Sequence, residues 1–188
     1  MRRHGDIGVR KNKVPQELCD LLISFFDNEW VLPKYRDSDR CEDTYKFLYD
    51  EPLRKQYSQY LRDCGDEYFK FYGHETWRKQ SMPITMKVQK TKPGQKGFQG
   101  IHWEQGQGLE NACRYAAWMT YLNDIDPDDG GKTVFPLQGM SLTPSRGTTV
   151  IWPAAYTHPH HAYPALSGAT PKYIVTGWFE YKPDNEKS

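Results

Sequence analysis

The sequence predicts an α+β, mainly β protein in which helices come first and buttress a β domain. Apolar residues recur at helical spacing from about residue 14 to 77, whereas short β-branched and aromatic runs alternate with turn signals from about 84 to 181. The chain also contains 13 Tyr, 8 Phe and 6 Trp, which suits a β-rich core because strands favour bulky flat side chains. Its 188 residues are enough for one substantial core, so we expect a single domain over residues 1–188.

Two segments of the first part have the pattern of amphipathic helices. The segment "VPQELCDLLISFF" places Leu18, Leu22 and Phe26 on one stripe behind Pro15, and proline is favoured in the first turn. The segment "EPLRKQYSQYLRDCGDEYFKFYG" repeats the pattern, and its last residue, Gly73, is predicted to end the helix. The polar stretch "DSDRCEDT" between them, residues 37–44, is predicted to be a loop.

The second part is predicted to consist of short strands joined by tight turns. The candidate strands are "ITMKVQKT", "RYAAWMTYLND", "KTVFPLQG", "GTTVIWPA" and "KYIVTGWFEY". The turn signals between them are "KPGQKG", "DPDDGG", "TPSRG" and "LSGATP". Short strands at this spacing are typical of a β-sandwich, a jelly roll or a small barrel.

Composition argues against several classes of protein. With 25 Lys+Arg against 24 Asp+Glu the net charge is +1, which gives no bulk attraction to nucleic acid or to a membrane surface. The four cysteines include no CxxC pair, which excludes the usual zinc-finger and thioredoxin patterns and is compatible with a reducing compartment. The start "MRRHGDIGVRKNK" has no apolar signal region, and no stretch approaches membrane-spanning length. We therefore expect a cytoplasmic protein without a nucleic-acid or membrane partner.

Two histidine-containing motifs point to a metal site. In "GIHWEQG" a strand would direct His102 and Glu104 to one face and Trp103 to the other, although a solvent-exposed polar face would show the same pattern. In "YTHPHHAYP" three of the six histidines of the chain follow an apolar strand. A histidine and a carboxylate two residues apart, with one distant histidine, form the facial triad of non-haem Fe(II) oxygenases, which leaves positions open for a co-substrate and O₂.

The segment 84–181 resembles the prolyl-4-hydroxylase-like branch of the Fe(II)/2-oxoglutarate-dependent dioxygenases, and small phage and viral members are especially similar. The matching pieces follow the order of the family: "HWE", "RYAAWMTYLND", "DGGKTVFP", "SRGTTVIWPAAYTHPHHAYP" and "SGATPKYIVTGWFEY". The resemblance implies a double-stranded β-helix (a cupin-like jelly roll) behind N-terminal helices. It also implies Fe(II) as the metal, 2-oxoglutarate and O₂ as co-substrates, and ascorbate as a reductant.

The resemblance assigns the metal ligands to His102, Glu104 and His160. Glu104 stands where the family usually has aspartate, so its carboxylate has a longer arm. Pro164 selects His160 as the distal ligand, because the family places that ligand four residues before a proline. His158 and His161 are the alternatives for this role, and we otherwise expect them at the rim or in hydrogen bonds around the metal ligands.

The resemblance also implies a set of residues around 2-oxoglutarate. Lys172 matches the basic residue that binds the far carboxylate, with Arg114 and Arg146 as fallback cations. Thr176 and Trp178 share the strand parity of Lys172 and are expected to face the same cavity. The remaining expected contacts of the co-substrate are Tyr121, Thr133 and Phe135.

The function implied by the resemblance is hydroxylation of an unactivated C–H bond, with decarboxylation of 2-oxoglutarate to succinate. Peptidyl proline in a peptide or protein partner is the first expectation, and a free amino acid or small metabolite is an alternative. A non-catalytic metal- or ligand-binding jelly roll stays open because of Glu104, and a cupin-like isomerase would not need Lys172. Likeness to viral members would place the protein in the cytoplasm of a host.

Overall fold

The computed structural model describes residues 1–28, 33–37, 41–106, 108–166 and 168–182. Its α-helices are α1 (Gln16–Asp27), α2 (Glu51–Lys70), α3 (Trp77–Gln80) and α4 (Leu109–Ala112), and short 3₁₀ turns cover Pro127–Asp129 and Pro136–Gln138. The first strands are β1 (Arg2–His4), β2 (Ile7–Arg10), β3 (Lys34–Asp37), β4 (Cys41–Phe47), β5 (Ser81–Thr91) and β6 (Gly97–Phe98). The later strands are β7 (Arg114–Tyr121), β8 (Thr133–Phe135), β9 (Met140–Leu142), β10 (Thr149–Pro153), β11 (His161–Ala162) and β12 (Lys172–Tyr181).

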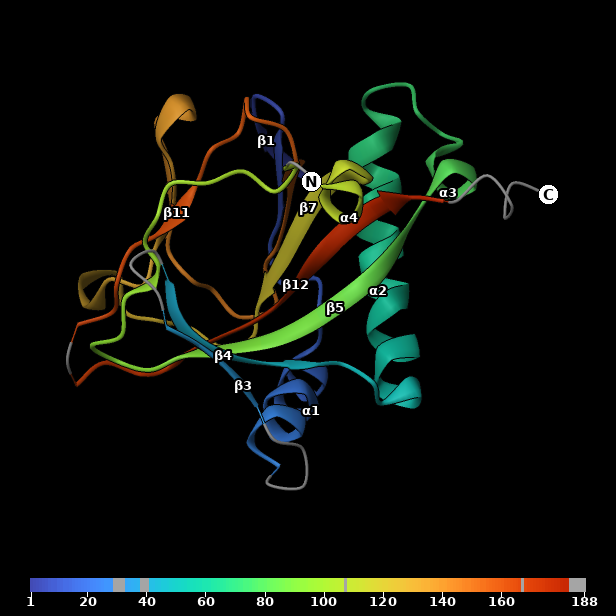
Figure 1. Cartoon of the computed structure of the whole chain (residues 1–188). Helices are drawn as coiled ribbons and strands as arrows, with labels where there is room; N and C mark the ends of the chain where they lie inside the picture. Colours follow the sequence, from blue (N-terminus) through green and yellow to red (C-terminus); the bar gives the residue numbers. More distant parts are fainter. Residues whose placement is uncertain (29–32, 38–40, 107, 167, 183–188) are drawn as a thin grey trace.

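The strands form two antiparallel sheets. Within the described residues the larger sheet has the order β1-β2-β10-β7-β12-β5-β4-β3, and β6 pairs with β4. The smaller sheet has the order β11-β8-β9. Figure 1 shows α2 running along one side of the larger sheet, whereas β11 and its neighbouring loops lie on the other side. The result is the double-stranded β-helix with N-terminal helices that the family resemblance implied.

Two apolar cores lie on opposite faces of the larger sheet. One core packs α1 and α2 against the sheet and includes Leu22, Tyr57 and Trp118, all fully buried. The second core lies between the sheets and joins Val150 and Trp152 of β10 to Phe135 of β8. Because side chains on a strand alternate between faces, each central strand supplies one set of residues to each core.

Both predicted helices are confirmed, and the residues just before each first turn explain where each helix begins. Pro15 directly precedes α1, and the Asp50 side chain caps α2 by accepting a hydrogen bond of 2.9 Å from the backbone N–H of Leu53. The helix α2 ends at Lys70, three residues before the predicted stop at Gly73. Within the described chain no helix is both long enough and apolar enough to cross a membrane.

The prediction of a loop over residues 37–44 is wrong at both ends, because Asp37 ends strand β3 and Cys41 begins strand β4. Polar composition hid this strand, which is stabilised by pairing with β5 rather than by its own apolar pattern. Asp43 is buried there and accepts a hydrogen bond of 2.7 Å from Gln89 Nε2. Residues 38–40 of the predicted loop lie outside the described residues. The sequence also gave no sign of the β1–β2 hairpin, which adds Ile7 and Val9 to the second core.

The pairing of β5 with β12 brings polar side chains together on one face of the larger sheet. Lys87 lies opposite Thr176, and Thr91 lies opposite Lys172. Residues that face each other across an antiparallel pair project to the same side of the sheet. This face is the one that the smaller sheet covers, so the fold builds a polar hollow inside an otherwise apolar layer.

We expect Gly177→Ala to lower the free energy of unfolding by about 1–3 kcal/mol, the usual cost of overpacking a core. Gly177 lies in β12 between Thr176 and Trp178, and an added Cβ would meet the backbone oxygen of Thr85 and lie 2.7 Å from Trp118 Cζ2. Urea denaturation followed by circular dichroism measures the change. Gly106→Ala is the matched control, because its Cβ would lie 3.6 Å from Asn111 Nδ2, an ordinary van der Waals contact. Equal stability of the two variants would refute the close approach at Gly177.

Candidate active site

The two predicted metal-binding segments are joined by a reciprocal pair of backbone hydrogen bonds. The N–H of His102 donates to the carbonyl of His160 at 3.1 Å, and the N–H of His160 donates to the carbonyl of His102 at 2.9 Å. Two residues later the N–H of Glu104 donates to the carbonyl of Ala154 at 3.1 Å. His102 thus forms an isolated bridge and Glu104 lies in a bend, so the expectation that both lie on a regular strand is wrong.

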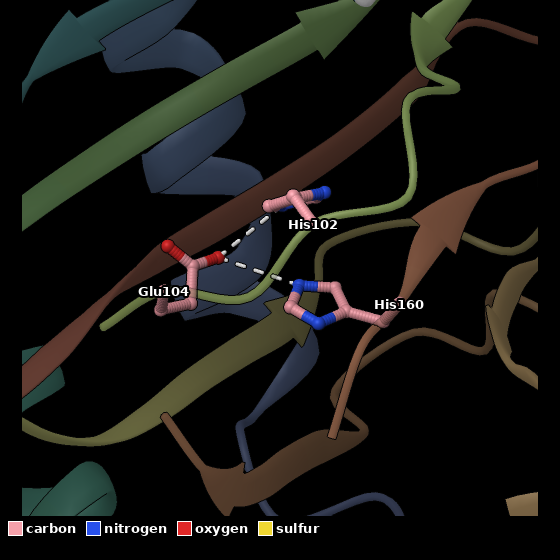
Figure 2. Close-up of side chains that lie close together, drawn as sticks. All are labelled: His102, Glu104 and His160. Carbon is pink, nitrogen blue, oxygen red and sulfur yellow. Dashed lines mark ion pairs between the residues drawn. The ribbon is translucent and has the colours of Figure 1, made fainter. Parts of the chain in front are cut away.

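The side chains of His102, Glu104 and His160 converge (Figure 2). Glu104 Oε1 lies 3.5 Å from His102 Nε2 and 3.3 Å from His160 Nε2. One ligand atom from each of the three residues lies within 4.8 Å of the other two. The structure therefore brings together the three residues that the sequence singled out as metal ligands.

Backbone carbonyls fix the tautomers of both histidines. His102 Nδ1 lies 2.9 Å from the carbonyl oxygen of Gly100, and His160 Nδ1 lies 3.1 Å from that of His158. A carbonyl oxygen can only accept, so each Nδ1 carries a hydrogen, and Nε2 is the atom of each ring that would bind a metal at the centre. This arrangement is typical of metal-bound histidines, whose second nitrogen is commonly held by a carbonyl or carboxylate.

Glu104 is held in its ionised form. Burial alone would raise the pKa of the carboxyl group, but hydrogen bonding to His102 and His160 keeps this pKa well below its usual range. Two imidazoles and one carboxylate are the donor set that suits Fe(II). A metal at about 2.1 Å from each donor would place neighbouring donor atoms about 3 Å apart. The two separations from Glu104 Oε1, 3.5 and 3.3 Å, are close to this value, so the residues present fit a divalent metal.

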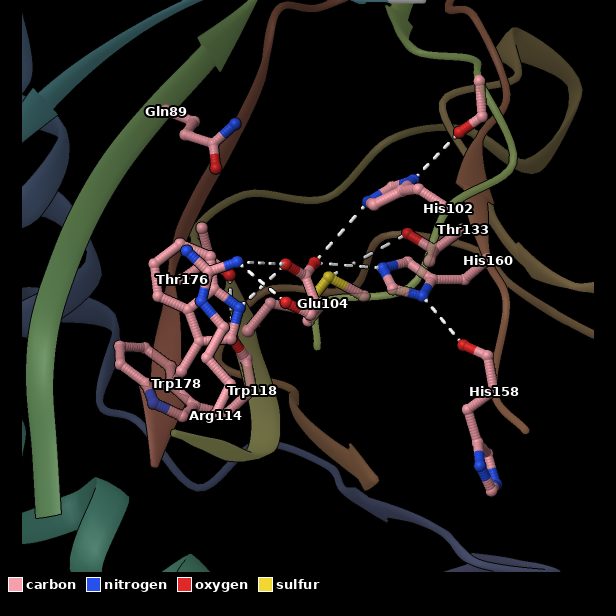
Figure 3. A network of polar contacts seen from close by, with 12 residues as sticks. Gln89, His102, Glu104, Arg114, Trp118, Thr133, His158, His160, Thr176 and Trp178 are labelled. Atoms are coloured by element: carbon pink, nitrogen blue, oxygen red, sulfur yellow. Dashed lines mark hydrogen bonds and ion pairs between the residues drawn. The ribbon is translucent and has the colours of Figure 1, made fainter. Parts of the chain in front are cut away.

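The structure separates His160 from the two competing histidines. His158 is buried, and its ring lies away from Glu104 (Figure 3) with Nδ1 2.9 Å from Thr157 Oγ1. Burial lowers the pKa of His158. His161 lies on β11, is half-buried, and lines the cavity described below. The geometry favours His160 as the third ligand, while His158 supports it through a backbone carbonyl.

A cavity of about 350 Å³ adjoins the three side chains. Its volume lies in the usual range for small-molecule sites, roughly 300–1,000 Å³. It is lined by Lys87, Gln89, Phe98, His102, Trp103, Glu104, Arg114, Met119, Thr133, Trp152, His160, His161, Ala162, Lys172, Ile174, Thr176 and Trp178. Lys172, Thr176 and Trp178 therefore face one cavity, as strand parity predicted.

Lys172 is a buried cation in the wall of this cavity. Only 6% of its surface is exposed, and its Nζ donates a hydrogen bond of 3.0 Å to the carbonyl oxygen of Gly131. Burial lowers the pKa of Lys172 to about 8, against an opposing contribution from the Asp43 carboxylate. An anion arriving beside Lys172 would relieve this cost of desolvation.

The other predicted contacts of the co-substrate are placed around the same cavity. Tyr121 is fully buried and donates a hydrogen bond of 2.9 Å to Thr133 Oγ1, so Thr133 stands between it and the cavity. Burial raises the pKa of Tyr121. Phe135 packs against the His160 ring at 5.4 Å between centroids, and Thr176 Oγ1 donates to the Trp118 carbonyl at 2.8 Å.

Arg146 and Arg114, the alternative cations for the co-substrate, lie in different parts of the structure. Arg146 pairs with Asp20 and donates to the carbonyl of Gln16, which ties a loop to α1. Arg114 lines the cavity, and its Nη1 donates a hydrogen bond of 2.9 Å to the backbone oxygen of Glu104.

Sequence reasoning missed several residues of the cavity wall. Lys87 and Gln89 lie on β5, opposite Thr176 and Ile174 of β12. The alternation of "MKVQKT", with Met86 and Val88 buried in the helix-facing core, could have indicated that Lys87 and Gln89 face the other way. Only the pairing of β5 with β12 shows which cavity they face.

The fold and the site together define a mononuclear non-haem iron oxygenase. The family model described as the 2OG-Fe(II) oxygenase superfamily matches residues 86–180, and the chain belongs to this superfamily. It is therefore an enzyme of that superfamily, and membership implies Fe(II) and 2-oxoglutarate.

Similar proteins include several prolyl hydroxylases. The alpha-1 subunit of human prolyl 4-hydroxylase is 33% identical over 74 residues, which are 39% of this chain but 14% of the subunit. A viral collagen prolyl hydroxylase from Paramecium Bursaria Chlorella virus-1 has a TM-score of 0.69 at 20% identity, covering 92% of this chain and 94% of the viral one. A Pseudomonas putida prolyl-4-hydroxylase has a TM-score of 0.75 at 16% identity, covering 95% and 94%. These structural likenesses support the fold.

We expect His160→Ala to weaken Mn(II) binding by at least about 100-fold, because it removes a proposed ligand rather than a supporting contact. His158→Ala should cost about tenfold or less, since the carbonyl that holds His160 belongs to the backbone and is retained. Calorimetric titration of the metal-free protein measures both affinities, and circular dichroism checks that both variants fold. A larger loss in His158→Ala than in His160→Ala would show that the distal ligand is misassigned.

The affinity for 2-oxoglutarate should fall as the pH rises through about 8. Below this pH Lys172 already carries its proton, whereas above it the lysine must take up a proton when the anion binds. Affinity should then decline by about tenfold per pH unit well above the pKa. Calorimetric titration between pH 7 and 10, with Mn(II) in place of iron, measures the trend. Lys172→Arg is the control, because arginine keeps its charge over this range and should flatten the curve.

Proposed function

We propose that the protein is an Fe(II)- and 2-oxoglutarate-dependent hydroxylase whose substrate is a prolyl residue of a peptide or protein. The observation that carries the proposal is the convergence of two imidazoles and one carboxylate on a cavity that also contains a buried lysine. The metal needs the first three groups, and a dicarboxylate co-substrate needs the fourth.

His102, Glu104 and His160 would hold the iron, each through one donor atom. Bound iron with 2-oxoglutarate and O₂ supplies the oxidising power for an unactivated C–H bond, while decarboxylation yields succinate. The contribution of the chain is to orient these ligands and to exclude water. The carbonyl oxygens bonded to both Nδ1 atoms keep each ring turned with Nε2 toward the proposed metal position. Ascorbate is proposed as the reductant that restores oxidised iron.

Lys172 would bind the far carboxylate of 2-oxoglutarate. Its Nζ is fixed by the Gly131 carbonyl, so the ammonium group is already in place before the anion arrives. Thr133 lines the same cavity with its hydroxyl hydrogen-bonded to Tyr121, which makes this pair the nearest polar support for the carboxylate. Trp178 and Thr176 extend the wall from Lys172 toward Glu104.

The peptide substrate is supported by the surface beside the cavity. Trp103 lines the cavity and is 50% exposed, and its neighbour Ile101 is 60% exposed. An exposed tryptophan next to the proposed metal site offers a flat apolar face on which a prolyl ring can pack. The similarity to collagen and other prolyl hydroxylases supports the same choice.

A free amino acid or another small carboxylate is the second candidate. The observation in its favour is that Lys87 and Arg114 line the cavity in addition to Lys172. Lys87 is buried, and its Nζ lies 4.6 Å from the centroid of the Trp178 ring. A second carboxylate could therefore be attracted to this part of the wall.

Succinate release in air, with Fe(II), 2-oxoglutarate and ascorbate, tests the proposal. We expect proline-rich peptides to stimulate release and to gain the mass of one oxygen atom, whereas matched peptides with alanine in place of proline should not. Stimulation by free amino acids but not by any peptide would favour the second candidate. The His160→Ala variant controls for uncatalysed release, and absence of turnover with every substrate class would count against the hydroxylase.

A further inference from the structure

The two oxygens of the Glu104 carboxylate have different partners (Figure 3). Oε1 faces His102 and His160, where the metal is proposed to bind. Oε2 accepts a hydrogen bond of 2.8 Å from Trp178 Nε1 and lies 3.6 Å from Arg114 Nη1. Oε2 is thus held by one hydrogen bond and one nearby cation on the side away from the histidines, and Oε1 is the oxygen that faces the proposed metal position.

Arg114 and Trp178 also hold each other. The guanidinium carbon of Arg114 lies 3.6 Å from the centroid of the Trp178 ring, which is a close cation–π contact. Arg114 Nη1 donates to the backbone oxygen of Glu104 as well, so it contacts both ends of that residue. Glu180, buried on β12 opposite Arg114, provides a second carboxylate near this cation.

We propose that Trp178 and Arg114 are positioning residues that restrain the Oε2 atom of Glu104 and so make this long side chain a one-oxygen ligand. The proposal rests on the proposed metal role of Glu104 and concerns how that role is achieved. Without the restraint, Glu104 could turn both oxygens to the metal and occupy a position that the co-substrate or O₂ requires.

The physical basis is preorganisation. A glutamate has more side-chain freedom than an aspartate, and fixing that freedom costs conformational entropy. Here the cost is met when the protein folds, because a charge-assisted hydrogen bond and a cation fix the carboxylate. Partners of this kind, which hold a ligand rather than touch the metal, typically account for about 10- to 100-fold of metal affinity.

The first test compares Trp178→Phe with Trp152→Phe in the full chain. Both tryptophans line the cavity, but Trp152 Nε1 has no hydrogen-bond partner among the described residues. We expect Trp178→Phe to weaken Mn(II) binding at least tenfold, by calorimetric titration, and Trp152→Phe to weaken it less than threefold. Equal losses would mean that ring volume matters rather than the hydrogen bond, and would overturn the proposal.

The second test needs no metal. In the metal-free protein, Glu104→Asp should move the indole N–H resonance of Trp178 upfield, because the shorter carboxylate cannot keep its bond to Nε1. The Trp152 resonance is the internal control, and Trp178→Phe identifies the signal by removing it. An unmoved Trp178 signal would overturn the proposal even if the metal binds. If the unmodified protein fails to bind Mn(II), the proposed function fails as well. If the unmodified protein binds Mn(II) and Trp178→Phe binds it equally well, only this inference fails.

Discussion

The reciprocal backbone bonds between His102 and His160 are the constraint on which the site depends. Two residues of antiparallel segments that exchange both hydrogen bonds have Cα atoms about 5.5 Å apart and side chains on one side. Here the rings approach to 4.4 Å between centroids. The two segments that carry the histidines are therefore close enough for both imidazoles to reach one metal position. The peptide backbone, rather than the metal, brings the two imidazoles together.

The place of Glu104 follows from the same pairing. After His102 the chain leaves extended geometry, and the N–H groups of Glu104 and Gln105 both donate to the carbonyl of Ala154. The bend fixes the backbone of Glu104. Trp178 donates a hydrogen bond to its Oε2, and Arg114 forms an ion pair with the same oxygen. A longer carboxylate is accommodated because both of its ends are held. The departure from aspartate is therefore part of a consistent local structure and gives no ground for treating the site as degraded.

Sequence reasoning succeeded where the signal was local and failed where it depended on pairing. Alternation along "KYIVTGWFEY" correctly put Lys172, Thr176 and Trp178 on one face, since parity needs no knowledge of neighbours. Strand β4 was missed because its polar residues are stabilised by β5, which is distant in sequence. The contacts of Arg114 and Trp178 with Glu104 were missed for the same reason, because Arg114 lies on β7 and Trp178 on β12, far apart in sequence. Family resemblance supplied the ligands, but only the fold shows what holds them.

Burial of the Lys172 ammonium group in the cavity wall costs free energy, and a bound anion would lower that cost. Lys172 is desolvated, and one carbonyl contact together with the Asp43 carboxylate offsets that penalty only in part, because its pKa stays below the usual range of lysine. Folding therefore maintains a buried ammonium group that, among the described residues, has one carbonyl partner and only a distant carboxylate. A ligand carboxylate that reaches Nζ gains an interaction for which the protein has already been desolvated and oriented. In the proposed function, this preference for an anion at one end of the cavity, with metal donors at the other, would select a molecule that carries both a chelating end and a distant carboxylate.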